Sequence, residues 1–456
     1  MSGTSLAARN AQLAAVGARS GASYALHRAR LVTADDERRD ELEAEYQLRT
    51  AAQVVDALGN MKGALMKIGQ MASYLDDGLP EPVRLALASL QQDAPPMTPE
   101  LCAQVVRTEL GAEPASRFAQ WDPEPIAAAS IGQVHRAVTH SGLRVAVKVQ
   151  YPGVDDAIRA DLVNTDLLFR VLGTMFPGLD PGPLVNELRD RLTEELDYGA
   201  EANNQRFFAD AFRDHPFISV PSVVDDLSTA RVLTTELADG ARFAELEQWT
   251  QTERDLAGEA IYRFVFGSIY RLHAFNGDPH PGNYLFRPGG HVTFLDFGLV
   301  KRYQPDEVAL FEALIRTFVV EHDVPAFRRL MEEHNVLRRD AALTDDDVAG
   351  YFGHFYELVM RDEVFKVDTE YSSETVRMYF DANGPFAHVA RAANVPPAFV
   401  ITQRINLGLT AVLGRLRATA NFRRIAEELW PFVGGPPSTP MGEAEAEWLA
   451  RRATRL

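Results

Sequence analysis

The residues whose types and spacing could do chemistry lie between positions 278 and 298. Asp278 and Asn283 are five residues apart in the run Asp-Pro-His-Pro-Gly-Asn, and Asp296-Phe297-Gly298 follows a short β-type run, His291 to Leu295. A carboxylate beside an acceptor hydroxyl, together with an amide oxygen and a second carboxylate that hold magnesium, is an arrangement used for phosphoryl transfer. Asp-Phe-Gly alone is a weak signal, but its combination with D-x-x-x-x-N is much stronger.

Lys148 lies in an alternating run, Arg144 to Gln150, that predicts a β-strand. The valines at 145, 147 and 149 point to one face of this strand and Lys148 points to the other. A lysine in such a strand can contact the α and β phosphates of a nucleotide when a helical acid braces it. A solvated strand lysine is the alternative interpretation.

Ala127, Ala129, Gly132 and Val134 occupy the spacing of a glycine-rich phosphate loop whose first two glycines are alanines. Glycine lets backbone N–H groups curl over phosphates, whereas the Cβ of alanine holds the turn further away. We therefore expect a nucleotide to be held differently than by a glycine-rich loop. An Ala-rich surface turn is the alternative.

Glu194, Asp197 and Glu201 are spaced i, i+3, i+7 and predict one acidic stripe on a helix. Like charges so placed repel by about a few tenths of a kcal/mol per pair. A solvated acidic face is the usual explanation. The absence of alternating signs favours a site in which these carboxylates meet Lys148 and another cation.

Several elements must position these residues. A short helix is expected from about Pro99 to Leu110, and a β-rich portion from about Ile126. A strand from Arg231 to Leu237 and a long helix from Asp255 to Phe275 lead into the loop that carries Asp278. The chain after about Asp306 is expected to be helical.

Six motifs together resemble the UbiB/AarF/ADCK family of atypical, protein-kinase-like proteins, and the likeness runs from about residue 50 to 300. The matching motifs are Lys67-Ile68-Gly69-Gln70, Ala127-Ala128-Ala129-Ser130, Val145-Ala146-Val147-Lys148, Glu195-Leu196-Asp197, Asp278 to Asn283, and Asp296-Phe297-Gly298. The resemblance implies a kinase-like fold that binds ATP or ADP with Mg²⁺.

The resemblance also implies roles for single residues. Lys148 would pair with Glu201 and the phosphates, and Asp278 would be the catalytic-loop acid. Asn283 and Asp296 would hold Mg²⁺. The remaining nucleotide contacts would come from the loop and the hinge, that is, from Ala127, Ala128, Ala129, Ser130, Gly132, Val134, Glu236 and Leu237.

By the same resemblance, an N-terminal helix folds across the site. Lys67 and Gln70 on this helix would face Glu195 and Asp197, and they would occlude the trough where a protein kinase holds its peptide. Protein substrates are therefore not expected. Relatives commonly have His-Ala-Asp where this chain has Asn276-Gly277-Asp278. Because that histidine usually supports the backbone, we expect a change of loop geometry rather than of chemistry.

The expected fold class is α+β, a protein-kinase-like bilobal fold with an N-terminal helical extension and an enlarged helical C-lobe. The expected parts are a flexible segment 1–33, a helical extension 34–115, an N-lobe 116–237, a C-lobe 238–432 and a tail 433–456.

Composition excludes several classes. Forty-six basic against 64 acidic residues give a net charge of −18, which argues against a nucleic-acid partner. A single cysteine, Cys102, excludes a disulfide or a cysteine-based zinc site within one chain and is expected to be a small buried residue. No secretion signal is evident, and the apolar segment 395–414 contains prolines and Arg404. A cytoplasmic protein is expected, with peripheral membrane contact.

The leading hypothesis is a Mg²⁺-dependent atypical kinase or ATPase that supports isoprenoid-quinone or related lipid metabolism and takes a lipid or quinone-precursor ligand. The alternative is a nucleotide-binding, pseudokinase-like regulator or scaffold of a lipid-biosynthetic complex. The acceptor of the phosphoryl group and the choice between ATP and ADP stay open at this point.

Overall fold

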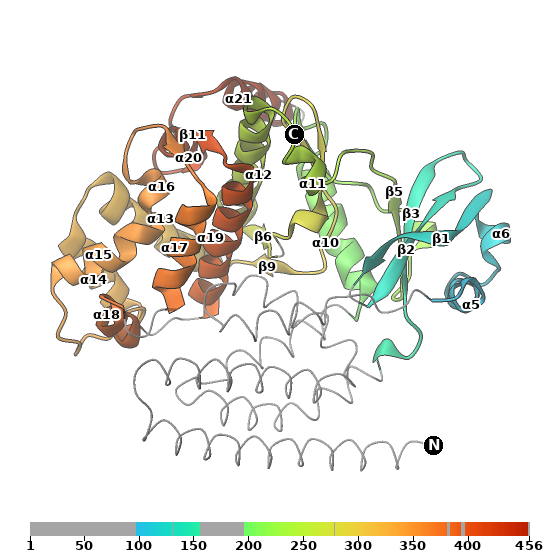
Figure 1. Ribbon diagram of the computed structural model, residues 1–456, viewed down its shortest axis with the longest axis horizontal. Helices are drawn as coiled ribbons and strands as arrows, with labels where there is room; N and C mark the ends of the chain where they lie inside the picture. The colour runs from blue at the N-terminus through green and yellow to red at the C-terminus, as the bar shows by residue number, and fades with distance from the viewer. Residues whose placement is uncertain are drawn as a thin grey trace, which may run out of the picture. The chain divides into compact units, whose positions relative to one another are not determined.

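A computed structural model describes residues 97–129, 131–155, 196–277, 279–380, 384–393 and 397–454. The chain divides into two compact units (Figure 1). Unit 1 comprises Met1–Ala200 with Val224–Thr235, and unit 2 comprises Glu201–Val223 with Glu236–Leu456. The last boundary between the two units falls between Thr235 and Glu236, at the start of the expected hinge. The domain boundaries expected from the sequence stay a prediction.

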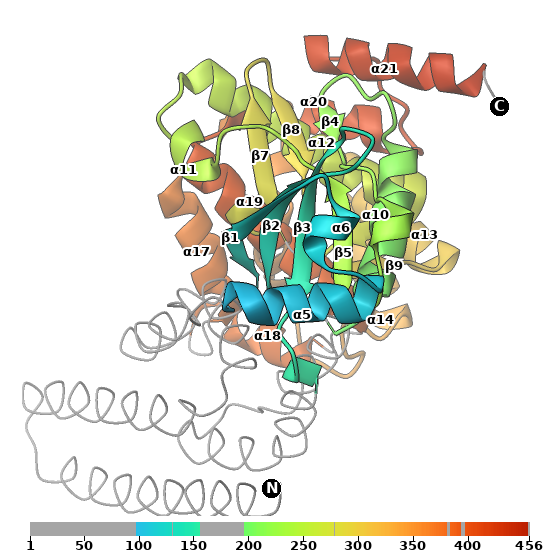
Figure 2. The same ribbon diagram turned by 90° about the vertical axis from the view of Figure 1, so that its right-hand side faces the viewer.

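The described part of unit 1 is built on a sheet with the strand order β1-β2-β3-β5. Its strands are β1 (Gln120–Ala129), β2 (Gly132–Val138), β3 (Arg144–Gln150) and β5 (Val232–Glu236). Strands β1, β2 and β3 pair antiparallel. Helix α5 (Pro99–Leu110) lies along this sheet (Figure 2), and the short helix α6 (Pro114–Arg117) follows it. The first segment of unit 2 then contains most of helix α10 (Tyr198–Ala211), which begins at the end of unit 1.

The valine alternation in β3 is confirmed. Val145, Val147 and Val149 are fully buried, and they belong to one core with Cys102 and Val106 of α5. Helix α5 starts where Thr98 accepts a hydrogen bond from the N–H of Leu101 and ends at Gly111, whose φ is +76°. Local capping and one apolar face therefore suffice to place this helix on the sheet.

Cys102 is only 1% exposed, as expected for a small buried residue. Burial raises the pKa of its thiol to about 11. The Sγ atom lies 3.3 Å from Nε2 of the buried His135. A thiol with so high a pKa holds its proton and is a poor nucleophile, so Cys102 is a core residue.

The start of the β-rich portion differs from the expectation. Strand β1 begins at Gln120 rather than near Ile126. Pro123 and Pro125 mask the strand in the sequence, because proline cannot donate a ladder hydrogen bond. The register of β1 against β2 shifts on both sides of Pro125, and β1 is an edge strand, where proline is tolerated.

Unit 2 is mainly helical and has a separate aromatic-rich core. Its central helix is α12 (Gln251–Leu272), capped by Thr250 at one end and closed by His273 in a left-handed conformation at the other. The other helices are α11 (Phe243–Leu246), α13 (Pro305–Ile315), a π-helical turn (Arg316–Val320), α14 (Val324–Glu333), α15 (Asp345–Phe355), α16 (Glu357–Met360), α17 (Thr369–Phe380), α18 (Ala387–Ala392), α19 (Pro397–Leu416), α20 (Phe422–Leu429) and α21 (Pro440–Ala453).

Short strands complete unit 2. Strand β8 (His291–Phe294) pairs antiparallel with β7 (Tyr284–Arg287) and parallel with β4 (Ile218–Ser219), while β6 (Ala274–Asn276) pairs antiparallel with β9 (Val300–Arg302). The expectation that the chain after about Asp306 is helical is wrong at one place. Phe365–Lys366 (β10) and Thr419–Ala420 (β11) pair between helices, because a contact so distant in sequence leaves no local pattern.

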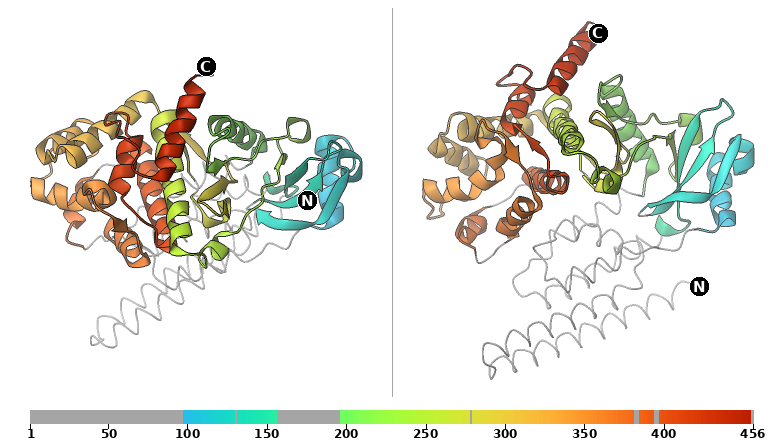
Figure 3. Two further views of the ribbon diagram at one scale, coloured as in Figure 1. Left: turned by 90° about the horizontal axis from the view of Figure 1, so that it is seen from above. Right: turned by 45° about the horizontal axis from the view of Figure 1, so that its top comes forward.

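The C-terminal helix α21 lies beside α12, as Figures 1 and 3 show. Its side chains Glu445 and Trp448 are buried. None of the helices in the described ranges combines the length and the apolar character that a bilayer crossing requires.

Candidate active site

The hairpin of β7 and β8 brings Asn283 and Asp296 to the same end. Tyr284 pairs with Phe294 in the antiparallel register, and the N–H of Leu295 donates to the carbonyl oxygen of Asn283 at 3.0 Å. Asn283 therefore immediately precedes one strand, and Asp296 follows the other after a single residue. Two oxygen-bearing side chains thirteen residues apart in sequence become neighbours through one short sheet.

The Asp296 turn is fixed from both sides. Its Oδ1 accepts a hydrogen bond from the N–H of Gly298 at 2.9 Å. Its main-chain carbonyl accepts one from Nδ2 of Asn276 at 2.6 Å. The N–H of Gly277 also donates to the carbonyl of Leu299 at 2.8 Å, which extends the pairing of β6 with β9. The segment before Asp278 and the segment around Asp296 are thus bonded to one another.

Asn276 supports the backbone of the Asp-Phe-Gly turn. Its side chain is almost fully buried, and its amide reaches the carbonyl of Asp296 directly. Gly277 allows the two segments to approach, because a Cβ there would come within 3.0 Å of the Leu299 side chain. The segment Asn276–Gly277 is thus tied to the Asp-Phe-Gly turn.

Glu201 lies beside the same turn. It is in the first turn of α10 and is only 6% exposed. A Cβ built on Gly298 would lie 3.2 Å from Oδ1 of Asp296 and 3.8 Å from Oε2 of Glu201, so both carboxylates border this glycine. One helical turn further on, Asn204 donates to the carbonyl of Phe297 at 3.2 Å. The paired negative charges would attract a cation to this end of the hairpin.

The loop between Asp278 and Asn283 is shaped by His280. Its Nδ1 accepts a hydrogen bond from the N–H of Gly282 at 3.0 Å and caps the 3₁₀ turn Pro281–Asn283. An imidazole nitrogen that accepts here carries no proton on that side. A Cβ on Gly282 would lie 2.9 Å from the same nitrogen, so a larger residue here would displace the imidazole. Asp278 itself lies outside the described residues.

Helix α19 packs against this loop, and the sequence did not reveal this contact. A Cβ on Gly408 would lie only 2.4 Å from Cγ of Pro279, so the proline ring packs directly on the helix backbone. A lone glycine within an apolar helical run is costly unless packing requires it. The sequence signal for this close packing was therefore Gly408, which stands between two leucines.

Unit 1 contains the expected phosphate-contacting residues. Val134 and Lys148 are direct partners across β2 and β3, and Ala129 pairs with Gly132 at the tip of the β1–β2 hairpin. Nζ of Lys148 lies over the ring of Tyr198 at 4.9 Å from its centroid. A Cβ on Gly132 would come within 2.3 Å of the carbonyl oxygen of Val149, so only glycine fits there.

The other two loop alanines follow the same strand. Ala127 pairs with Val134 and Ala128 with Gln133, so the Ala-rich segment continues β1 rather than forming an isolated turn. Ser130 lies outside the described residues, as do Lys67, Gln70, Glu194 and Glu195.

The acidic stripe expected on one helix is wrong for Asp197. Helix α10 begins at Tyr198, and Asp197 precedes it with an exposed side chain whose Oδ1 accepts the N–H of Gly199 at 2.8 Å. Asp197 therefore satisfies an N–H in the first turn of this helix, where aspartate is favoured. Of the three acidic residues expected to form the stripe, Glu201 lies within helix α10.

The expected hinge follows β5. The N–H of Glu236 donates to the carbonyl of Ser222 at 2.9 Å, and its carboxylate accepts the N–H of Ser222 at 3.1 Å. This N–H is thus already engaged within the protein. An adenine base would have to use the carbonyl of Glu236 or the backbone of Leu237.

Comparison with known proteins decides the family. The model of the ABC1 atypical kinase-like domain matches residues 89–330, more than half of the 456 residues. The chain belongs to the ABC1 atypical kinase-like family. Its α+β kinase-like fold and its resemblance to UbiB/AarF/ADCK proteins are thereby confirmed.

Two relatives illustrate the ABC1 family likeness. The chain is 34% identical over 255 residues to "Atypical kinase COQ8B, mitochondrial" of Rattus norvegicus, and the alignment covers 56% of this chain and 48% of the relative. It is 31% identical over 265 residues to "Atypical kinase COQ8, mitochondrial" of Saccharomyces cerevisiae, covering 58% of this chain and 53% of the relative. The chain thus spans about half the length of these relatives.

A solved structure agrees with the ABC1 fold. The Mycobacterium tuberculosis protein Rv3197, in its complex with erythromycin, aligns with a TM-score of 0.64 and 33% identity. The alignment covers 87% of this chain and 100% of that one.

Proposed function

We propose that this chain is a Mg²⁺-dependent atypical kinase or ATPase that binds ATP or ADP. The observation that carries the proposal is the hairpin end at which Asn283 and Asp296 meet, with the Asp296 backbone held by Asn276. Membership of the ABC1 family supports it. Asp278 is assigned as the acid that orients the acceptor.

The donor set fits magnesium. Asn283 and Asp296 offer an amide oxygen and a carboxylate, and Mg²⁺ is usually held by one or two carboxylates together with substrate phosphates. Within the described ranges, no group of three or more His, Cys, Asp or Glu side chains could hold a metal by itself, which agrees with a site that the phosphates complete. When bound, the metal neutralises charge that develops on the transferred phosphoryl group.

The protein's own residues would position the nucleotide. We assign Lys148, paired with Glu201, and the loop residues 127–134 to the phosphates. The Cβ atoms of Ala127 and Ala129 make this loop less able to wrap the phosphates than three glycines would be. Adenine would bind the carbonyl of Glu236 and the backbone of Leu237, because the Glu236 N–H already bonds to Ser222.

We further propose that the acceptor is a small molecule or lipid of isoprenoid-quinone or related metabolism, reached from the cytoplasm by peripheral contact with a membrane. This follows from the family resemblance. Lys67 and Gln70, opposite Glu195 and Asp197, would exclude peptide substrates.

The metal assignment is tested with Asp296→Asn. The substitution removes one negative charge from the metal site, and we expect Mg²⁺-dependent nucleotide hydrolysis to fall by about a hundredfold or more, because such charges stabilise the transition state by several kcal/mol. Asp340→Asn, at an exposed position in unit 2, is the matched control and should leave turnover unchanged. Hydrolysis by Asp296→Asn at the wild-type rate would refute the assignment.

The same assay distinguishes the alternative function. A purified wild-type chain that binds ATP or ADP by calorimetry but hydrolyses neither, with lipid vesicles and quinone-precursor mimics present, would be a nucleotide-binding regulator or scaffold. By the family resemblance His280 stands where a protein kinase has a catalytic-loop lysine. This histidine, the alanines at 127 and 129 and the expected occluding helix all favour this second candidate.

A further inference from the structure

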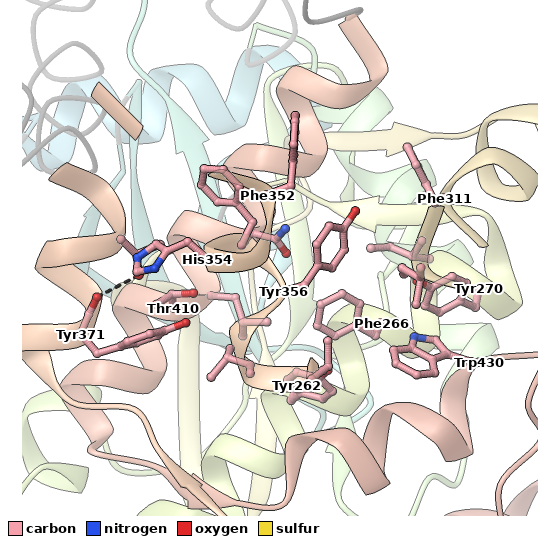
Figure 4. Close-up of a pocket in the computed structure, with 18 of the residues that line it drawn as sticks. Tyr262, Phe266, Tyr270, Phe311, Phe352, His354, Tyr356, Tyr371, Thr410 and Trp430 are labelled. Atoms are coloured by element: carbon pink, nitrogen blue, oxygen red, sulfur yellow. Dashed lines mark hydrogen bonds between the residues drawn. The ribbon is translucent and has the colours of Figure 1, made fainter. Parts of the chain in front are cut away.

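Unit 2 encloses an aromatic-lined cavity of about 130 Å³, shown in Figure 4. Its walls come from α12, α13, α14, α15, α16, α17 and α19, and from the segments after α14 and α20. The principal aromatic lining residues are Tyr262, Phe266, Tyr270, Phe352, Tyr356 and Trp430. An apolar cavity of ~150 Å³ in another protein binds benzene, so this one has room for about one six-membered ring.

The cavity wall is uncharged. Its lining residues, all within the described ranges, include no Asp, Glu, Lys or Arg. Burial raises the pKa of Tyr262 and Tyr356, and it raises that of Tyr270 well above its usual value. These phenols therefore stay neutral at physiological pH. Because an ion would lose its hydration without compensation here, the occupant should be neutral.

His354 provides a polar group in this apolar wall. Its Nε2 is buried and has no hydrogen-bond partner within the described part of the chain. Its Nδ1 lies 3.5 Å from a carboxylate oxygen of Glu357, which favours the proton on Nδ1. In that tautomer Nε2 is an acceptor. A buried acceptor without a donor calls for a partner, and the partner that fits is a hydroxyl.

Other polar groups near His354 are engaged within the protein. The Thr375 hydroxyl donates to the carbonyl of Tyr371 at 2.9 Å, the dashed line in Figure 4. The Thr410 carbonyl accepts from the hydroxyl of Ser372 at 3.0 Å. With these groups engaged, the buried Nε2 of His354 is an acceptor in the wall that a donor from a ligand could reach.

The backbone beside the cavity is also unusual. Phe311 and Ile315 of α13 line it, and the π-helical turn Arg316–Val320 begins directly after Ile315. Single π-turns are uncommon and occur frequently at functional sites, since they widen a helix at the cost of regular bonding. This second observation points to a ligand site rather than a packing defect.

We propose that this cavity binds a small neutral alcohol, with an apolar body of about one six-membered ring and a hydroxyl that donates to Nε2 of His354. The aromatic wall would supply affinity through apolar burial, and His354 would select the hydroxyl.

The site is tested with the full chain and ortho-bromobenzyl alcohol. Bromine quenches tryptophan fluorescence at contact range, and Trp430 lines the cavity. We expect saturable quenching that is lost in Trp430→Phe and retained in Trp448→Phe, whose indole lies on α21 outside the lining. Quenching that does not saturate, or that survives in Trp430→Phe, would overturn the proposal.

The hydroxyl contact is tested separately. His354→Leu should weaken binding of the bromobenzyl alcohol by about tenfold, the loss expected for one buried hydrogen bond. It should leave ortho-bromotoluene, which has no hydroxyl, bound as before. His334→Leu, at an exposed position at the end of α14, is the matched control. If the wild type binds both compounds with equal affinity, His354 does not select the hydroxyl. A single buried water bound to Nε2 would then account for this acceptor.

Discussion

Asn276 is a single side chain on which the geometry of the proposed site depends. Its amide bonds to the carbonyl of Asp296 at 2.6 Å from a nearly fully buried position. The bond joins the segment before Asp278 to the turn that carries Asp296. A side-chain N–H at position 276 would join the two segments equally well from an amide or from an imidazole, provided that the side chain is long enough to reach the Asp296 carbonyl.

We predict that Asn276→Ala lowers affinity for Mg²⁺ with ATP by about tenfold and destabilises the fold by about 1–3 kcal/mol, because the Asp296 carbonyl loses a buried donor. Nucleotide titration calorimetry and urea unfolding measure the two effects. Asn276→His should recover most of the nucleotide affinity, since an imidazole N–H can reach the same carbonyl. If Asn276→Ala binds nucleotide like the wild type while losing stability, Asn276 has a purely structural role.

Helix α12 is tied to the two C-terminal helices by a buried guanidinium. Arg263 is 1% exposed, and its nitrogens lie 2.8, 2.9 and 3.0 Å from carboxylate oxygens of Glu259, Glu428 and Glu445. Arg271 adds a second positive charge beside Glu445. Two cations thus face three carboxylates among these five residues, and loss of the central arginine would leave the carboxylates with little compensation.

We predict that Arg263→Met destabilises the protein by about 3–5 kcal/mol, the usual cost of leaving buried charges unpaired. Glu445→Gln should cost less, because it leaves equal numbers of both signs in this cluster. The comparison is made by chemical unfolding of both variants. Arg451→Met on α21, whose side chain is 59% exposed, is the control and should change stability by about 1 kcal/mol or less. Equal losses in Arg263→Met and Arg451→Met would contradict this account.

At the scale of the whole molecule, the same cluster links folding to pH. Burial alone would raise the pKa of Glu445, but His215, Arg271 and Arg263 together lower it to about 2 from its ordinary 4.5. Burial lowers the pKa of His215 below its ordinary 6.5. Both groups bind fewer protons when folded than when unfolded. Their stabilising effect is therefore complete above pH 6.5 and is lost as the pH falls, for His215 first and for Glu445 between 4.5 and 2.

We predict that acidification from about pH 5 to about pH 3 reduces the free energy of unfolding by up to roughly 2 kcal/mol through Glu445. Urea unfolding across this range measures the slope. Glu445→Gln should flatten it, whereas Glu447→Gln, on the same helix and 75% exposed, should keep the wild-type slope. An unchanged slope in Glu445→Gln would assign the acid sensitivity to other groups.

Local patterns in the sequence predicted several elements well. The alternation of Val145, Val147 and Val149 predicted β3 with its bounds, and the helix expected from about Pro99 to Leu110 is α5. These predictions hold because side-chain period and helix capping act over a few residues. The start of strand β1 was missed because two prolines mask it in the sequence. The β10–β11 pair was missed because it depends on a partner distant in sequence.

By itself, the sequence determined the family motifs and the fold class, since chemistry-bearing residues at fixed spacings are local properties of the chain. Only the tertiary structure decided that Asn276 supports Asp296, that Gly408 lets Pro279 pack on α19, and that Arg263 meets Glu445 across 182 positions. It alone showed the neutral cavity around His354. The physical reason is that burial and pairing depend on which distant side chains share a space, and no local pattern in a single sequence records that.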